Sequence, residues 1–505
     1  MQKFQFFLSL LVTLSLTLAI NLADLTSSQV FSILGNTNGN SYQFPISNAG
    51  DANKDGKDDI ILGAYGSKES AFLIYGTDTW NPVNIYFPTP TFDPASAGII
   101  ITKSTNSDGF GSSIRSAGDV NGDGYDDLVI GAFRKTSYRG QASVIYGGPS
   151  LPNLDANNLI PASNGFTISS ANSNSHLGCS VSKAGKVNGD VYDDVVVGIS
   201  NLNSNRGAAI VVYGGSTSTR SSIQVTGSAA TLSVLNSGFS ILGNAAGDAF
   251  GLSVSNIGDI NGDGYDDILV GAAQKASQKG AAYVIYGSQS PTNIDLSSYT
   301  LVPASTGFTI LGNTAGDFFG GSVSSAGDVN GDGIPDIIVG AYDKDSNKGA
   351  AYIIYGRQSP ADIDLSSETL LPATTGFVVK GSAANDQLGF SVNSVGDLNN
   401  DGFGDVIIGA PGQGAVHVIY GGGFSDIDLS SVTLDPAKNG FTIAGSSSGK
   451  FGFSVSSGDF DNDGKIELFV GTSGTISSEA AGYIINLSSK GFFVNKRIKI
   501  LFRNV

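Results

Sequence analysis

The sequence predicts an all-β protein, a seven-bladed β-propeller of four-stranded antiparallel blades. Two observations predict this fold: an acidic nine-residue motif recurs seven times, and short β-branched runs recur around each copy. No segment carries a sustained apolar period of 3.6 residues, so helices are not expected. In a propeller each sheet buries its faces against its neighbours, and the repeats therefore stabilise one another as a closed array.

The acidic motif reads D-x-N/D-x-D-G-x-x-D/E, and successive copies begin 62 to 73 residues apart. Seven copies at nearly equal spacing cover most of the chain, so we assign one copy to each blade. The third copy is degenerate. The seven loops are 51–59, 119–127, 186–194, 259–267, 328–336, 397–405 and 459–467.

The segments around each loop predict four strands per repeat. An aromatic-Gly pair such as Phe110-Gly111 opens the first, and a run ending in Gly-Ala, such as 128–133, forms the second. A third run such as 142–146 and a fourth such as 307–312 follow. Each run is short, rich in β-branched residues and bounded by turn residues, which is the pattern of a strand.

The two ends of the chain predict how the ring closes. Residues 31–35 (FSILG) resemble a fourth strand, but no first three strands precede them. The last repeat has three strands, near 451–456, 466–471 and 481–487, and no good fourth. We therefore expect the N-terminal strand to complete the last blade and remove an open sheet edge.

Two features lie outside the plain repeat. Segments such as 293–307 and 362–376 are similar to each other in sequence, and we place them between blades as ordered surface excursions. In the first blade, Tyr42, Gln43 and Pro45 replace the usual Phe-Gly-x-Ser pattern, and proline suits only an edge or a bulge.

Composition narrows the class of protein. With 40% hydrophobic and 14% charged residues, the chain is not of the disordered class. Its net charge of -17 has the opposite sign to that of a nucleic-acid-binding face. A single cysteine, Cys179, excludes a disulfide framework. We expect no nucleic-acid partner.

The N-terminus predicts secretion. Lys3 precedes an apolar stretch from Phe4 to Ile20, and Ala19 and Ala23 offer cleavage points, as in a signal peptide. An uncleaved anchor is the alternative, because the stretch is near the lower limit for spanning a bilayer. We assign 1–23 to the signal peptide, 24–488 to the propeller and 489–505 to a basic tail. The mature protein would be secreted or at the cell surface, with no transmembrane anchor.

The acidic loops are candidate calcium sites. Ca²⁺ takes six to eight oxygen ligands, and oxygens at alternate positions of a tight turn converge on one point. Positions one, three, five and nine would bind through side chains and position seven through its carbonyl, while glycine at position six permits the turn. The side-chain ligands are Asp51, Asn53, Asp55, Asp59; Asp119, Asn121, Asp123, Asp127; Asp259, Asn261, Asp263, Asp267; Asp328, Asn330, Asp332, Asp336; Asp397, Asn399, Asp401, Asp405; and Asp459, Asp461, Asp463, Glu467.

Other interpretations of the loops were weighed. An EF-hand needs a glutamate at position twelve, where these loops have residues such as Ile130 and Val270. Mg²⁺ suits an all-protein oxygen cage less well than Ca²⁺. Plain Asx-Gly hairpin turns remain an alternative. In the third loop Lys186 and Val191 replace the first aspartate and the glycine, so we expect about six Ca²⁺ ions, with a structural role and none in this loop.

The aromatic-Gly pairs, the acidic loops and the Gly-Ala strand ends resemble the FG-GAP repeats of integrin alpha chains, over about residues 31–487. The resemblance implies a seven-bladed propeller with calcium loops on its lower face, and ligands and a β subunit on the opposite side. Similar repeats occur in bacterial surface proteins, a GPI-specific phospholipase D and some fungal lectins. The inserted domain, leg domains and membrane helix of an integrin alpha chain have no counterpart in the sequence.

Catalytic chemistry is not expected. The two histidines, His176 and His417, belong to different repeats, and neither has a neighbour at zinc-ligand spacing. No phosphate-binding glycine loop is present. We therefore expect a non-enzymatic module that binds an extracellular protein in cell adhesion, with an integrin-beta-like partner possible. A glycan-binding lectin and a structural surface protein are the alternatives.

Overall fold

The structure is a computed structural model. It describes residues 19–22, 25, 29–36, 41–66, 69–79, 83–86, 91–93, 97–103, 107–234, 236–357, 360–423, 425–475 and 480–487. Most of the expected signal peptide and all of the 489–505 tail lie outside these residues.

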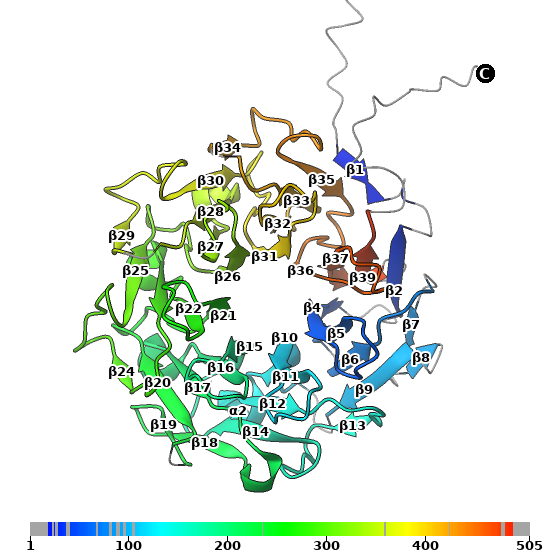
Figure 1. The fold of residues 1–505 in the computed structure, drawn as a ribbon, viewed down its shortest axis with the longest axis vertical. Coiled ribbons are helices and arrows are strands. Elements are labelled where there is room, and N and C mark those ends of the chain that lie inside the picture. The colour runs from blue at the N-terminus through cyan, green and yellow to red at the C-terminus, as the bar shows by residue number, and fades with distance from the viewer. Residues whose placement is uncertain are drawn as a thin grey trace, which may run out of the picture.

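Seven β-sheets stand around a central channel and form a closed ring (Figure 1). This confirms the expected fold. The first strands line the channel: β4 (Ile46–Gly50), β10 (Phe110–Gly118), β15 (Leu177–Gly185), β21 (Ser253–Gly258), β26 (Ser322–Gly327), β31 (Ser391–Gly396) and β36 (Ser454–Gly458).

The second and third strands form the buried middle of each blade. Their β-branched and alanine side chains lie between neighbouring sheets and make up the core. The second strands are β5 (Asp59–Ala64), β11 (Asp127–Ala132), β16 (Asp194–Ile199), β22 (Asp267–Gly271), β27 (Asp336–Ala341), β32 (Asp405–Ala410) and β37 (Glu467–Gly471). The third strands are β6 (Ser70–Ile74), β12 (Gln141–Ile145), β17 (Ala208–Val212), β23 (Ala281–Ile285), β28 (Ala350–Ile354), β33 (Ala415–Ile419) and β39 (Ala480–Ile485).

The fourth strand of the seventh blade comes from the N-terminus, as expected. Strand β2 (Val30–Asn36) pairs antiparallel with β39, with Phe31 opposite Ile484, and Figure 1 shows the two strands side by side where the ends of the chain meet. The other fourth strands are β9 (Gly98–Thr102), β14 (Gly165–Ser170), β20 (Gly238–Leu242), β25 (Gly307–Leu311), β30 (Gly376–Lys380) and β35 (Gly440–Ala444).

The repeated segments are not placed between blades, and this expectation was wrong. Each connects the third and fourth strands of its own blade and reaches back to add a parallel fifth strand to the preceding blade; for example, Ile294 pairs with Ile241. The blades therefore have more than four strands. The added strands are β13 (Leu154–Asp155), β18 (Ile223–Thr226), β24 (Ile294–Asp295), β29 (Ile363–Asp364), β34 (Ile427–Asp428) and β7 (Val83–Tyr86).

The remaining elements are short. Strand β1 (Ala19–Asn21) adds a parallel strand to β35, β19 (Thr231–Leu232) and β8 (Thr91–Asp93) extend two sheets, and β3 (Ser41–Gln43) pairs with β38 (Ser473–Thr475). Helical turns α2 (Lys135–Tyr138), α3 (Leu202–Asn205), α4 (Lys275–Gln278) and α5 (Lys344–Asn347) join second to third strands, and η3 (Thr217–Thr219) is a single 3-10 turn. Within the described ranges, no helix has the length and apolar character needed to cross a membrane.

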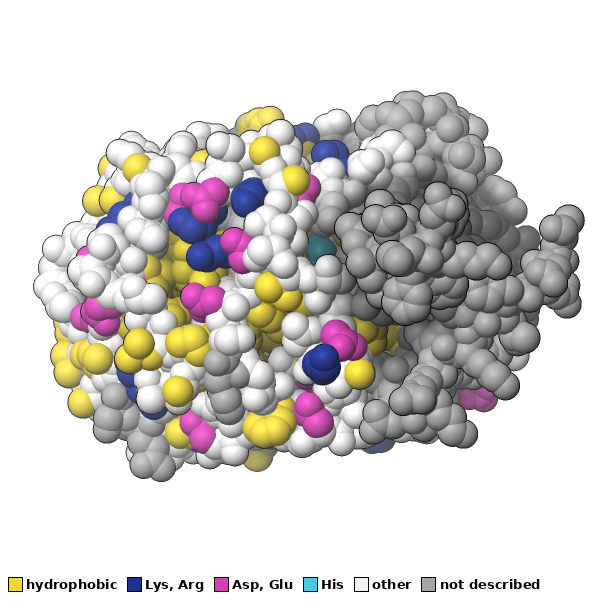
Figure 2. Space-filling view, turned by 90° about the horizontal axis from the view of Figure 1, so that it is seen from above, with side chains coloured by type: hydrophobic (Ala, Val, Ile, Leu, Met, Phe, Trp, Pro, Cys, Tyr) yellow, Lys and Arg dark blue, Asp and Glu magenta, His cyan; other side chains and the backbone are white. Residues whose placement is uncertain are grey.

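The repeated Ser and Gly of the motif make contacts between blades. The hydroxyl of Ser322 donates to the carbonyl of Gly389 in the next blade at 2.7 Å, and four further blades make the same bond. A Cβ on Gly340 would lie 2.0 Å from that same carbonyl oxygen. Glycine is therefore required on the second strand because the neighbouring backbone occupies the space of a side chain. Along one side of the ring, charged side chains of both signs lie among uncharged ones (Figure 2).

Candidate metal centres

Each acidic loop joins the first strand of a blade to the second. In the loop 119–127 the carboxylate of Asp119 accepts hydrogen bonds from the backbone N–H groups of Gly122 at 2.6 Å and Gly124 at 2.9 Å. The Asp259 and Asp328 carboxylates accept bonds from the corresponding glycines of their own loops. The backbone of each loop therefore turns around the carboxylate at position one. Glycine suits the positions whose N–H groups point to this carboxylate, because it adopts the tight turn without strain.

Positions three and five face each other across the turn. The Asn121 side chain accepts from the Asp123 N–H at 2.8 Å and donates to the Asp123 carboxylate at 2.9 Å. Asp123 also accepts from the Tyr125 N–H at 3.1 Å. The same three bonds occur in the loops that begin at Asp51 and Asp397. Because the Asp123 N–H also donates to Asp119, oxygens of positions one and three converge on the backbone of position five.

Position nine lies beneath the turn, inside the blade. Asp127 is fully buried, and its two oxygens accept from the Val120 N–H at 2.9 Å and the Gly147 N–H at 2.8 Å. Burial raises the pKa of Asp127 well above its usual range. Burial also raises the pKa of Asp59 and Asp267 to about 8 and that of Asp336 and Asp405 to about 7. A buried carboxylate of this kind ionises readily only when a nearby cation compensates its charge.

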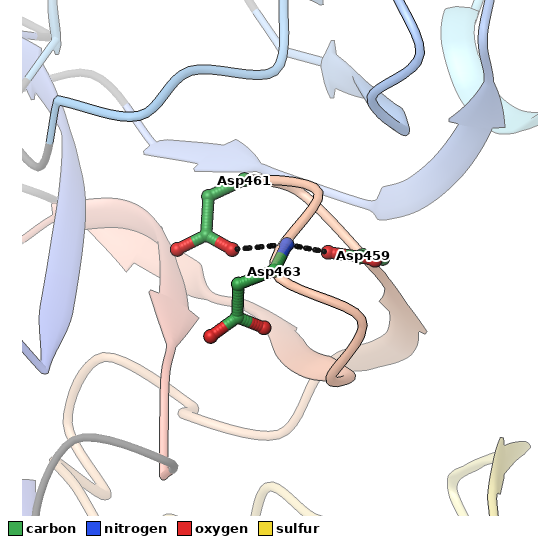
Figure 3. Close-up of side chains that lie close together, drawn as sticks. All are labelled: Asp459, Asp461 and Asp463. Atoms are coloured by element: carbon green, nitrogen blue, oxygen red, sulfur yellow. Dashed lines mark hydrogen bonds between the residues drawn. The ribbon is translucent and has the colours of Figure 1, made fainter.

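The seventh loop has the most complete set of carboxylates (Figure 3). Oxygens of Asp459, Asp461 and Asp463 lie within 4.8 Å of one another, and no other group of three acidic, histidine or cysteine side chains does so among the residues that the structure describes. The Asp463 N–H donates to Asp459 at 3.0 Å and to Asp461 at 3.3 Å. In the other complete loops an asparagine holds position three, so only two of these three side chains are acidic.

The surroundings of Glu467, at position nine of the seventh loop, show whether a cation would fit this site. One oxygen accepts from the Phe460 N–H at 2.9 Å, while the buried Oε1 has no hydrogen-bond donor. Burial first, and then the negative charges of Asp461, Asp463 and Asp459, raise the pKa of Glu467 to about 9. An orphaned carboxylate oxygen beside three aspartates fits a hard cation, which would supply the missing partner.

The degenerate third loop keeps the turn but not the first carboxylate. Asn188 and Asp190 make the same bonds to each other as their counterparts do, and Asp194 is buried. Lys186 is exposed, and no acidic side chain of the described residues lies within ion-pair distance of its ammonium. Its side chain therefore does not fill the place of an ion.

Sequence reasoning missed the aspartate at position eight. The Asp126 carboxylate accepts from the N–H of Asp51, the first residue of the preceding loop, at 2.9 Å, and the Asp126 N–H donates to the Asp51 carbonyl. Asp193, Asp266 and Asp58 accept in the same way from the loops before them. The signal in the sequence that could have predicted these links is the pair of consecutive aspartates that ends four of the seven loops.

The two histidines lie in different blades, and the cysteine lies three residues after His176. His417 is buried on β33, where its ring nitrogens contact Thr442 and Gln413, each at 2.9 Å. The His176 ring packs against Phe133 and Tyr138 in a different blade. Cys179 lies on β15, and burial raises the pKa of its thiol. Neither histidine lies in an acidic loop.

Comparison with known proteins agrees with this geometry. The family model described as the FG-GAP repeat matches residues 110–145, 250–285, 319–354 and 390–419. Each match begins at the first strand of a blade or within three residues before it and ends on the third strand, and so contains one acidic loop. The four matches lie in the second, fourth, fifth and sixth blades.

The relatives are longer than this chain. Integrin alpha pat-2 of Caenorhabditis elegans is 28% identical over 295 residues, covering 56% of this chain and 22% of that protein. Integrin alpha-5 of Xenopus laevis is 26% identical over 287 residues, covering 54% and 24%. A phosphatidylinositol-glycan-specific phospholipase D of Mus musculus is 35% identical over 117 residues, covering 21% and 14%.

Among solved structures, that of Chaetomium thermophilum Sqt1 covers 90% of this chain and 97% of its own, at 12% identity and a TM-score of 0.41. The sequence relatives are the informative ones, and this chain matches about a quarter or less of their length. The chain is a seven-bladed β-propeller that contains FG-GAP repeats in four places and is similar in sequence to integrin alpha chains.

Proposed function

We propose that this chain is an extracellular, calcium-stabilised propeller that binds a protein partner in cell adhesion and has no catalytic role. The observation that carries the proposal is the similarity to integrin alpha chains over more than half of the chain. In addition, the two histidines lie in different blades: His176 directly precedes β15, and His417 lies on β33.

Calcium is the cofactor that the loops support best. Their donors are all oxygens, and the seventh loop joins three close aspartates to a buried, unpartnered glutamate oxygen. Residues at positions one, three, five and nine of six loops would hold the ions, one ion per loop. Bound there, Ca²⁺ would neutralise the carboxylates and fix the turn, which gives it a structural role.

Ion counting on the purified mature chain tests this assignment. We expect about six Ca²⁺ per chain, by calorimetric titration after chelation and dialysis. Asp332→Asn should remove about one ion because it weakens an intact loop. The matched control, Asp190→Asn in the degenerate third loop, should leave the count unchanged. A chain that binds no calcium would refute the cofactor assignment.

The partner is tested by capture. The mature chain, immobilised in millimolar calcium, should retain a defined cell-surface protein, including an integrin-beta-like chain as one candidate, and should release it when a chelator is added. Specific binding on a glycan array, with no protein retained, would favour the lectin alternative. Retention of neither would favour a structural surface role and contradict the proposal.

Secretion is tested at the N-terminus. Sequencing the protein recovered from culture medium should show a new terminus after Ala19 or Ala23. The position matters because β1 (Ala19–Asn21) pairs with β35, and cleavage after Ala23 would remove that strand. Retention of Met1 on a membrane-bound product would support the uncleaved anchor.

A further inference from the structure

The central channel carries a ring of equivalent side chains, one from each first strand. Each pairs in register with the third residue of its second strand, as Arg115 does with Val129 and Ser182 with Val196. We call these seven residues the channel ring: Ser47, Arg115, Ser182, Ser255, Ser324, Asn393 and Ser456.

Six members of the channel ring are small and uncharged, and the second blade alone supplies an arginine. The hydroxyl and amide groups of the ring bond to each other and to backbone; for example, Ser324 donates to Asn393 at 2.9 Å. Arg115 donates to the Ser47 hydroxyl at 3.2 Å. A guanidinium has five N–H donors, and this is the one hydrogen bond of the Arg115 side chain within the described residues.

No carboxylate of the described residues forms an ion pair with Arg115. The channel holds one cavity of about 360 Å³ and a second of about 200 Å³, and Arg115 lines both. Among the residues that the structure describes, no Asp or Glu lines either cavity. Lys183 is the second cation there, and it pairs with Asp193 at 3.2 Å.

An unpaired, partly buried guanidinium is costly unless a counter-ion or acceptor reaches it. Burial lowers the pKa of Arg115, and no neighbouring charge opposes that effect. Arginine nevertheless stays protonated in proteins. Its planar set of donors matches the oxygens of phosphate or sulfate, to which it binds in a bidentate manner. The neighbouring ring member Ser182 offers a hydroxyl donor, and the Ser47 hydroxyl, which donates to the Asn48 carbonyl at 3.2 Å, can turn its proton to an anion instead.

We propose that the central channel binds one small inorganic oxyanion, of the phosphate or sulfate type, on the guanidinium of Arg115. The anion takes hydroxyl hydrogen bonds from adjacent members of the channel ring. This site is separate from the acidic loops and does not depend on the proposed adhesion partner. It links the second blade to its neighbours through a shared ligand.

Calorimetric titration of the full mature chain with sodium sulfate tests the site. The buffer contains calcium chloride, and sodium chloride holds the ionic strength constant. We expect saturable binding of one sulfate per chain. Arg115→Ser, which places at this position the residue used by five of the other blades, should weaken binding by about tenfold or more. Arg115→Lys should bind with an intermediate affinity because it keeps the charge but loses the bidentate geometry.

Arg139→Ser is the matched control, since it removes the same charge from an exposed position outside the channel. It should bind sulfate as the wild-type chain does. Absence of sulfate binding to the wild-type chain would overturn the proposal, as would equal affinities of the wild-type and Arg115→Ser chains. Should Arg115→Ser fail to fold, a titration of Arg115→Lys that matches the wild type in affinity would overturn it equally.

Discussion

Gly340 shows how a single atom sets the packing between blades. A Cβ at this position would lie 2.0 Å from the backbone oxygen of Gly389, and backbone cannot move aside as a side chain can. Equivalent glycines with the same close contact recur on the other second strands. The Gly-Ala ending of these strands is therefore a requirement of close approach between sheets.

Replacement of Gly340 by alanine should destabilise the ring. We expect Gly340→Ala to lower the free energy of unfolding by about 1–3 kcal/mol because the added methyl group forces the sheets apart. Urea denaturation monitored by far-ultraviolet circular dichroism measures this change in the free energy of unfolding. Gly423→Ala is the control, since its Cβ would have no atom closer than 4.0 Å, and it should change the midpoint little. Equal effects of the two substitutions would contradict the packing argument.

His417 predicts a pH dependence of stability. Burial lowers the pKa of His417 to about 4, and Asp386 opposes the shift only in part. Gln413 accepts from one ring nitrogen and Thr442 donates to the other, which suits the neutral ring. Below pH 6.5 the unfolded chain takes up a proton that the folded chain does not, so this contribution to stability falls as the pH drops towards 4 and levels off below that.

The expected loss attributable to His417 is about 3 kcal/mol between pH 6.5 and 4. His417→Gln removes the titrating group and keeps a hydrogen-bonding side chain. Denaturation of both chains across this range measures the difference, because the remaining carboxylates are common to the two. The stability of the variant should fall less steeply with decreasing pH, and parallel curves would show that His417 does not contribute.

At the scale of elements, successive acidic loops are tied together. Asp126 accepts from the Asp51 N–H at 2.9 Å, and a Cβ on Gly50 would lie 2.2 Å from the same carboxylate. The link repeats around the ring through Asp193, Asp266 and Asp58, the last of which bridges the seventh blade to the first. The loops thus connect blades and do not merely end strands.

Removal of one such link should cost a measurable amount. We expect Asp126→Ala to lower the free energy of unfolding by about 1–2 kcal/mol, since it leaves the Asp51 N–H without its acceptor. Asp126→Asn keeps an acceptor oxygen and should cost less. Thermal denaturation in the presence of a chelator isolates the link from ion binding. If Asp126→Asn lowered the free energy of unfolding as much as Asp126→Ala does, the loss would come from the missing charge and not from the hydrogen bond.

The strands and loops could be predicted from the sequence because their signals are local. Phe31 to Gly35 resembles other fourth strands closely enough to predict the closure with β39. The fifth strands could not be predicted in the same way. Ile294 and Asp295 form a segment too short to carry a strand pattern, and their partner β20 lies in another blade. The inward placement of Asp127 likewise depends on Gly147, which is contributed by the end of a different strand.

For the whole molecule, calcium and charge are linked. Six bound Ca²⁺ ions would offset about twelve of the net -17 charges of the chain. Ions that bind only the folded ring stabilise it by about 2.7 kcal/mol per site at a concentration one hundred times the dissociation constant. The melting temperature should therefore fall when EGTA is added and recover when calcium is restored.

Differential scanning calorimetry of the mature chain measures this shift. Magnesium alone should restore less of the lost stability, because the all-protein oxygen cage suits the larger ion. A melting curve that does not respond to EGTA would show that the loops hold no ion under these conditions. High salt is the control, since screening of surface charge should not reproduce the effect of calcium.

The pairing of β2 with β39 has a consequence for biosynthesis. Val30 to Asn36 leaves the ribosome among the first segments, but its partner strand ends at Ile485. During elongation β2 has no partner strand, while the middle repeats can already stack on one another. The pairing of β2 with β39 joins distant parts of the chain and forms slowly. The nascent protein therefore exposes two unpaired sheet edges until the last repeat emerges.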